Sequence, residues 1–485
     1  MKQKSGDKKN RKSKILIKDL PKVGSLWVLL GPAFVWAATA QGSGELIWWP
    51  YLVARYGKAF LFLLLPFALI QFFVNREISK FTAVTGEGIW RGFLSIGKLY
   101  ALPLFLFCFV NFLWFGGYAT AGGSSLYEVL KWPSGISIKT GSLLWAYVLV
   151  VVFSIALLLS KVIYKFIENV MKVVTVITIT GLSLSVILVG KWVNVVDFVD
   201  GLFNPLSLGV GVDWGNFDYS KLITALVFAG MGGFLNLMYS YWMKDKGVGM
   251  AGFSEKIRGI FSEKKSQITN HKSQILIIEN NEKNRKRWRG WTRYLNMDSG
   301  LAVGINMLTI ILTSFLSFVL LWPERNYPEG WSITVAQSAF FESSFGSIGR
   351  IVFLVVAAAF LVDTWLALVD GVSRQFADFM YGWIGNKWWM KDERSWYYFW
   401  LIFLIIVSLI TMPLAEPGVL MKLIGVISVF AFVFYIPALW YLNYVKLPAK
   451  YPEFVKSGLV SGLMLWLVWG VYTALAGWYL YQLRQ

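Results

Sequence analysis

The stretch ATAQGSGELIWW, from Ala38 to Trp49, lies inside an apolar run that extends from about residue 25 to residue 56. Its two glycines weaken a helix, because glycine costs about 1 kcal/mol relative to alanine in a helix interior. Its glutamate, Glu45, is unfavourable in a membrane, where a charge at the bilayer centre costs about 2.5–3.5 kcal/mol on insertion scales. A weak backbone and a carboxylate at the same place indicate a site rather than an ordinary helix.

The composition of the whole chain indicates a membrane protein. The 485 residues are 56% hydrophobic and 15% charged, with a mean hydropathy of +0.57, which excludes a disordered chain and disfavours an ordinary soluble domain. Apolar stretches of 18 or more residues recur, and about 20 residues cross a bilayer as a helix. The sequence therefore predicts an all-α polytopic protein with about eleven spans, at about residues 25–56, 58–75, 99–121, 142–160, 166–190, 221–243, 299–322, 348–372, 396–412, 419–443 and 456–481.

The positive charges lie on one side of these spans. The net charge is +19. Of the 46 Lys and Arg residues, nine lie in the first 22 residues and thirteen lie between Lys244 and Arg293. Both stretches are on the same side if the spans alternate, so the N-terminus is expected in the cytoplasm and the C-terminus outside. We interpret the basic tail as a partner of the lipid bilayer and expect no nucleic-acid binding.

The chain divides into three parts around one insert. We expect a basic cytoplasmic tail (1–24), a transporter-like core of ten spans (25–443) and an additional helix (456–481). The insert, residues 247–296, is predicted to be an exposed cytoplasmic loop, partly helical, and its basic-aromatic run KNRKRWRGW suits a membrane surface.

A second glycine-rich stretch, AGMGGFLN from Ala229 to Asn236, lies about five spans after the first. Glycine-interrupted segments at corresponding positions of two halves point to an inverted-repeat transporter with broken helices. Close helix packing through small residues is the alternative explanation. Two stretches at matching places favour broken first and sixth helices.

These motifs resemble the Nramp family of divalent-metal transporters. The family's Gly-Pro-Gly-Phe and Asp-Pro-Gly-Asn match Gly31–Phe34 and Gly42–Glu45, its Val-Thr-Gly matches Val84–Gly86, and its Met-Pro-His-Asn matches Gly233–Asn236. The resemblance runs over about residues 31–441 at low identity. It implies a LeuT-type 5+5 inverted repeat that works by alternating access.

The chain departs from the family at the residues that matter for metal binding. The resemblance places Gly42 and Gly233 where the family has its Asp and Met ligands, and Glu45 where it has Asn, whereas Asn236 is retained. The proton-linked groups of the family fall on Leu235, Ser240, Asn111, Tyr118 and Ala121. We therefore expect weak proton coupling or none. The candidate substrate-binding residues are Thr39, Gly42, Glu45, Gly230, Gly233 and Asn236, with Glu45 and Asn236 as metal ligands.

Two substrate classes are open. Without the thioether, the donors are a carboxylate, an amide and carbonyls, which suit a hard divalent cation such as Mg²⁺ better than Mn²⁺ or Fe²⁺. Alternatively, the enlarged cavity takes an organic solute or organic cation between aromatic rings. The aromatic candidates are Trp36, Trp48, Trp49, Trp114, Phe115, Tyr118, Tyr239 and Trp242.

Other acidic groups have two readings each. Glu45 is either a ligand or the carboxylate that caps a half-helix, and the two roles are compatible. Asp363 and Asp370 are seven residues apart, hence on one helical face, and join Asn111 and Tyr118 as candidates for the transport path. The chain lacks a phosphate-binding loop and clusters of His, Cys or paired carboxylates, so we expect a non-enzymatic protein without a cofactor.

Overall fold

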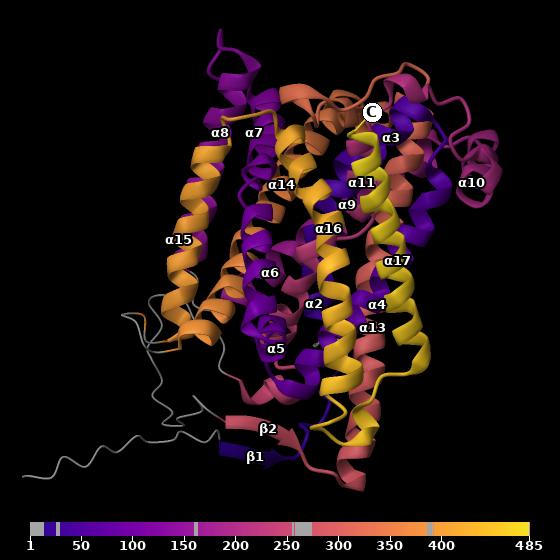
Figure 1. The fold of residues 1–485 in the computed structure, drawn as a ribbon. Helices are drawn as coiled ribbons and strands as arrows, with labels where there is room; N and C mark the ends of the chain where they lie inside the picture. The colour runs from indigo at the N-terminus through magenta and orange to yellow at the C-terminus, as the bar shows by residue number, and fades with distance from the viewer. Residues whose placement is uncertain are drawn as a thin grey trace, which may run out of the picture.

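The computed structural model describes residues 14–25, 30–159, 163–254, 257, 274–385, 390 and 392–484, and they form a helical bundle with a small sheet at one end (Figure 1). Within these residues, nine continuous helical stretches are long and apolar enough to cross a membrane. They contain α4 (Leu61–Thr85), α6 (Lys98–Asn111) with α7 (Gly116–Leu130), α8 (Ile138–Leu159), α9 (Ile163–Val189), α13 (Glu282–Leu316), α14 (Ala339–Ile384), α15 (Glu393–Thr411), α16 (Pro417–Tyr441) and α17 (Leu459–Gln482).

The two predicted spans outside this set are the two that contain the glycine stretches. The first is assembled from α2 (Gly31–Ala40), the π-helix η1 (Gln41–Trp48) and α3 (Trp49–Tyr56). The sixth is assembled from α11 (Tyr219–Val227), the 3₁₀ helix η4 (Gly233–Met238) and α12 (Tyr239–Lys246). No single helix of either reaches the length of a span, although together the pieces do. The multi-span prediction is confirmed.

The first span is not unwound, contrary to the expectation of two broken helices. Its backbone stays helical from Gly31 to Tyr56, but Gln41–Trp48 is wound as a π-helix with i→i+5 hydrogen bonds. The sixth span is broken as predicted: between α11 and η4, Gly232 and Gly233 have φ of 76° and 50°, which side-chain-bearing residues rarely adopt.

The remaining elements are short and connect the spans. They are α5 (Ile89–Ile96), α10 (Trp192–Phe203), η2 (Pro205–Ser207), η3 (Trp214–Asn216), η5 (Gly249–Phe253), η6 (Ser317–Leu321), η7 (Gly330–Ser332), η8 (Ala336–Ser338), η9 (Leu442–Lys446) and η10 (Glu453–Val455). The outer helices expose apolar side chains, for example Leu159 (59%) on α8 and Ile187 (74%) on α9, as lipid-facing helices do. α2, by contrast, is buried along nearly its whole length.

A two-stranded parallel sheet ties the N-terminal segment to the far end of the bundle. β1 (Lys14–Lys18) pairs with β2 (Gln274–Ile278) in the register Lys14↔Gln274, below the helices in Figure 1. Hydrogen bonds from Lys283 and Asn284 then hold the following Asp19 and lower its pKa to about 2, so Asp19 is ionised at neutral pH.

The prediction of an exposed loop over residues 247–296 is wrong in its second half. α13 begins at Glu282, well before the predicted seventh span, and buries Trp288 and Trp291 of the basic-aromatic run and Tyr294 just after it. Amphipathic residues at helical spacing, with arginines outward and aromatics inward, explain this extension. The part of the insert at residues 258–273 lies outside the described residues.

Candidate functional site

The glycines of η1 allow close approach between the first span and its neighbours. A Cβ at Gly44 would lie 1.6 Å from the Phe228 carbonyl oxygen, at the end of α11. A Cβ at Gly42 would lie 2.1 Å from Thr364 Oγ1 on α14. Both glycines have helical backbones, so the sequence needs them for packing rather than for an unusual φ. They bring η1, the break of the sixth span and α14 together.

The backbone groups exposed by the break in the sixth span are satisfied by side chains. Gln71 Nε2 donates to the Val227 carbonyl (2.9 Å), and Gln71 Oε1 accepts from the Gly232 amide (3.3 Å). Asn306 Nδ2 donates to the Ala229 carbonyl (2.7 Å), and Gln375 Nε2 to the Phe234 carbonyl (3.3 Å). Irregular backbone is tolerated at membrane depth only with such partners. The Val227, Ala229 and Phe234 carbonyls are therefore engaged, and the role of the other carbonyls of the break as ligands stays a prediction.

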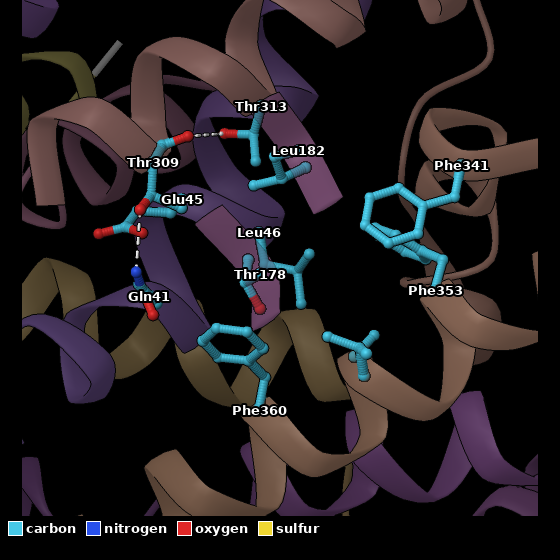
Figure 2. A pocket seen from close by; sticks show the side chains of 12 residues that line it. Gln41, Glu45, Leu46, Thr178, Leu182, Thr309, Thr313, Phe341, Phe353 and Phe360 are labelled. Carbon is cyan, nitrogen blue, oxygen red and sulfur yellow. Dashed lines mark hydrogen bonds between the residues drawn. The ribbon is translucent and has the colours of Figure 1, made fainter. Parts of the chain in front are cut away.

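A small cavity lies between η1, α9, α13 and α14 (Figure 2). Its volume is about 20 Å³, enough for one water molecule, which needs about 10–15 Å³ on this measure. Its polar lining comes from Gln41, Glu45, Thr178, Thr309 and Thr313. Its apolar lining comes from Leu46, Leu182, Phe341, Phe353, Val356, Ala357 and Phe360.

Glu45 is the charged group of this cavity. The residue is fully buried, and neither carboxylate oxygen accepts a hydrogen bond of normal geometry from the described residues. Thr309 lies beside the carboxylate in Figure 2, but its hydroxyl donates to the Ile305 carbonyl (3.0 Å). A buried carboxylate without donors is unfavourable unless a proton or a cation compensates it.

The other polar groups of the cavity also present oxygen atoms. The Thr313 hydroxyl donates to the Thr309 carbonyl (3.0 Å), which leaves lone pairs of both hydroxyl oxygens available. Gln41 Nε2 donates to Thr309 Oγ1 (2.8 Å), and Gln41 Oε1 is buried without a donor among the described residues. A carboxylate, an amide oxygen and hydroxyl oxygens are the donor set of a hard cation.

Asn236 is placed against different neighbours from Glu45. Its Nδ2 donates to Gln71 Oε1 (3.1 Å) on α4, whereas Glu45 faces α9, α13 and α14. Among the described residues no hydrogen bond joins Glu45 to Asn236, and no group of three or more His, Cys, Asp or Glu could hold a metal. The assignment of Glu45 and Asn236 as metal ligands stays a prediction.

The two aspartates of α14 have different surroundings. Asp370 accepts from Arg374 Nε (2.8 Å) and from the Tyr397 hydroxyl (2.7 Å), and Arg374 also pairs with Asp245 on α12. Asp363 is equally buried, but its carboxylate has no hydrogen-bond partner among the described residues. Asp370 therefore belongs to an ion-pair network, and Asp363 stays a candidate for the transport path.

The remaining predicted residues are spread over the core. Thr39 donates to its own helix at the Val35 carbonyl (2.7 Å), and Asn111 and Tyr118 are buried on either side of the interruption between α6 and α7. A Cβ at Gly230 or Gly233 would meet Gln71 or Ser428 at 2.5 Å. The eight predicted aromatic residues are all described, and none lines the Glu45 cavity.

Sequence reasoning missed Gln41, Gln71, Asn306 and Thr309. Each is a buried polar side chain inside an apolar span, and that is a signal the sequence carries. Gln41 also lies four residues before Glu45, on the same face of the helix. Their partners on other helices lie 77 to 268 residues away in the chain, so the contacts themselves are visible only in the fold.

Neither a protein-family model nor a curated protein matches the chain, whereas solved structures do. A variant of the manganese transporter of Eremococcus coleocola matches with a TM-score of 0.64 and 13% identity, over 96% of this chain and 89% of that one. The same transporter in complex with an aromatic bis-isothiourea-substituted compound gives 0.62 at 13% identity, over 96% and 89%. MhsT in complex with L-phenylalanine gives 0.56 at 13% identity, over 95% and 98%.

At 13% identity these matches show a shared fold only. The predicted resemblance is therefore confirmed for the fold, in agreement with the broken sixth span and the two glycine stretches. The chain has the LeuT-type fold of a multi-span membrane protein, in an Nramp-like form.

Proposed function

We propose that the protein is a secondary transporter that moves a small hard cation by alternating access, with Glu45 as its charged ligand. The observation that carries the proposal is the buried Glu45 carboxylate, which has no hydrogen-bond donor among the described residues and lies beside a small, mostly apolar cavity whose polar lining is this carboxylate, one amide and three threonine hydroxyls. The fold supports the transport part, because the manganese transporter and MhsT share it. Alternating access requires the first span to move. Its segment Gln41–Trp48 is a π-helix, and π-helical segments are frequent at functional sites.

The donor set favours a hard ion over a soft one. The described residues that line the cavity carry no sulfur or imidazole, so none of them selects Mn²⁺, Fe²⁺ or Cd²⁺ over Mg²⁺. The resemblance leads to the same preference, since Gly233 stands where the family has methionine. We therefore propose Mg²⁺ as the first divalent candidate. One carboxylate suits Mg²⁺, but Mg²⁺ usually keeps several of its waters, so the cavity of about 20 Å³ must widen to admit the hydrated ion.

The size of the cavity disfavours the organic-solute alternative in this conformation. About 20 Å³ holds an ion or a water molecule but not an aromatic solute. The aromatic residues proposed for such a solute are packed in the core, with Trp36, Trp49 and Trp242 fully buried. Transport of an organic solute would require the core to open widely. The titration described below includes an outcome that favours this alternative.

The orientation remains part of the proposal. β1 lies at one end of the bundle and the C-terminus at the other, as Figure 1 shows. The end with the sheet also carries the basic start of α13 and the lysines of β1, so we place it in the cytoplasm and the C-terminus outside. The core then spans residues 25–443, with residues 456–481 as an added helix.

Isothermal titration of the purified protein with Mg²⁺, Mn²⁺ and Cd²⁺ tests the proposed site. We expect modest Mg²⁺ affinity and Mn²⁺ affinity within about tenfold of it. Glu45→Gln should lose the heat of binding, because it removes the one carboxylate among the described residues that line the cavity. Glu342→Gln, on the partly exposed start of α14, is the matched control and should bind as the wild type. Tight Mn²⁺ or Cd²⁺ binding contradicts the hard-ion assignment, and no heat from any ion favours the organic solute.

A further inference from the structure

A basic pocket lies at the end of the bundle that carries the sheet. It is enclosed by α4, by the first half of α13 and by the turn at η10 that precedes α17. Figure 1 shows the loop before α17 beside the lower end of α13. The polar and aromatic residues that line it are Arg76, Lys80, Trp288, Thr292, Lys456 and Ser457, and its volume is about 30 Å³. None of the described residues that line this pocket is acidic.

The charges around the pocket do not cancel. The nearby carboxylate, Glu77, is buried and already engaged by Arg76 Nη1 (2.8 Å), Ser457 Oγ (2.7 Å), Ser461 Oγ (2.7 Å) and Asn443 Nδ2 (2.8 Å). Lys80 is only 4% exposed, and its ammonium donates to Ser457 Oγ. Three cations, from Arg76, Lys80 and Lys456, against Glu77 and the exposed Glu453 at the start of η10 leave a local charge of +1.

An almost buried ammonium in such a setting calls for an anion. Lys80 Nζ has three hydrogens, and Ser457 takes one of them. Burial of a charge is costly unless it is paired and hydrogen-bonded. Phosphate oxygens are strong acceptors for Lys and Arg, so a phosphate group at the mouth of the pocket supplies both the charge and the acceptors.

The surface around the pocket has the profile of a lipid site. Arg285, Arg289 and Arg293 are exposed at four-residue spacing on α13 and extend the positive surface. Beyond Lys456, the first turns of α17 expose Leu459 (77%), Val460 (67%) and Leu463 (59%). A phospholipid has a charged headgroup joined to apolar acyl chains. Its headgroup would lie on the basic surface, and its acyl chains would lie along the adjacent apolar face of α17.

We propose that this pocket binds the phosphate of an anionic phospholipid, with Arg76, Lys80 and Lys456 as the headgroup ligands and α17 as the support for the acyl chains. Basic pockets between spanning helices commonly bind such headgroups. The proposal does not depend on the transported cation. The bound lipid would join α4, α13 and the added helix α17 at one end of the bundle.

Native mass spectrometry of the full chain, titrated with phosphatidylglycerol or phosphatidylcholine, tests the proposal. We expect tighter binding of phosphatidylglycerol and an affinity reduced about fivefold in Lys456→Gln, since one basic residue near a bilayer contributes about that factor. Lys450→Gln, an exposed lysine before the same turn but outside the pocket, is the matched control and should leave the affinity unchanged. Lys456 is exposed, so its substitution leaves the packed core intact.

Three results would overturn the proposal. Equal affinity for the two lipids would show that the pocket does not distinguish an anionic headgroup from a zwitterionic one. Equal losses in Lys456→Gln and Lys450→Gln show a diffuse surface effect rather than a pocket. Displacement of phosphatidylglycerol by millimolar inorganic phosphate, with no contribution from the acyl chains, assigns the pocket to free phosphate instead of lipid.

Discussion

Gly44 and Phe228 touch: a Cβ at position 44 would lie 1.6 Å from the Phe228 carbonyl oxygen. This contact joins the π-helix of the first span to the end of α11, where the sixth span breaks. The contact explains why a glycine, which weakens a helix, lies next to Glu45. Gly44 allows η1 and the end of α11 to pack closely, and this packing positions the helical turn that carries the Glu45 carboxylate.

Gly44→Ala should therefore separate η1 from α11 and lower both stability and flux. Overpacking of this kind costs about 1–3 kcal/mol. Gly304→Ala is the matched control, because Gly304 lies on α13 with nothing within 4 Å of its added Cβ. It should be neutral or slightly stabilising, since alanine favours a helix. Thermal unfolding of both variants in detergent measures the difference, and equal melting temperatures would contradict the role given to Gly44.

The two glycine stretches show what the sequence can and cannot predict. Their positions predicted the break of the sixth span correctly, but the break predicted in the first span is a π-helix instead. The sequence could not tell that Gly42 and Gly44 serve close packing on a helical backbone, whereas Gly232 and Gly233 supply positive φ. Glycine meets both needs, and only the neighbours in space decide which one applies.

The candidate site was predictable in part for a related reason. Glu45 is visible in the sequence, because a carboxylate in an apolar span needs a task or a partner. The neighbours Thr309 and Thr313 come from a span more than 260 residues later, and the pairing of Glu45 with Asn236 rested on the resemblance alone. The fold turns Asn236 towards Gln71 instead.

Gln71→Leu should destabilise the broken sixth span. The amide of Gln71 serves the Val227 carbonyl, the Gly232 amide and Asn236, and a buried polar group left without a partner costs about 1–3 kcal/mol. We expect a lower melting temperature and reduced flux. Leu69→Ala, on the exposed side of the same helix, should change neither strongly. Unchanged stability in Gln71→Leu would show that water or another side chain satisfies the break.

Asp363→Asn and Asp370→Asn should have opposite effects on stability. Asp370→Asn removes a charged partner of the buried Arg374, and breaking a buried ion pair costs about 3–5 kcal/mol. Asp363→Asn removes a buried carboxylate without partners, so it should maintain or raise the melting temperature. The two positions lie on the same helix, seven residues apart, and thermal unfolding of the two variants measures this contrast. A lower melting temperature for Asp363→Asn would reveal a partner for Asp363.

The same pair reports on proton coupling. We expect wild-type transport without substrate-dependent acidification of proteoliposomes, because the family's proton-linked groups fall on Leu235 and Ser240 here. Acidification that disappears in Asp363→Asn, with flux otherwise retained, would show that Asp363 carries a proton relay and that the expectation is wrong.

The central claim is that Glu45 binds a hard cation during transport, and cation uptake into proteoliposomes that contain the wild type or Glu45→Gln tests it most directly. The wild type should take up Mg²⁺ at a rate above that of empty liposomes and without strong preference for Mn²⁺. Glu45→Gln should lose this uptake while melting at the same or a higher temperature, because it removes a buried charge without hydrogen-bond donors. Full Mg²⁺ uptake by Glu45→Gln, or no uptake of either ion by the wild type, would contradict the account.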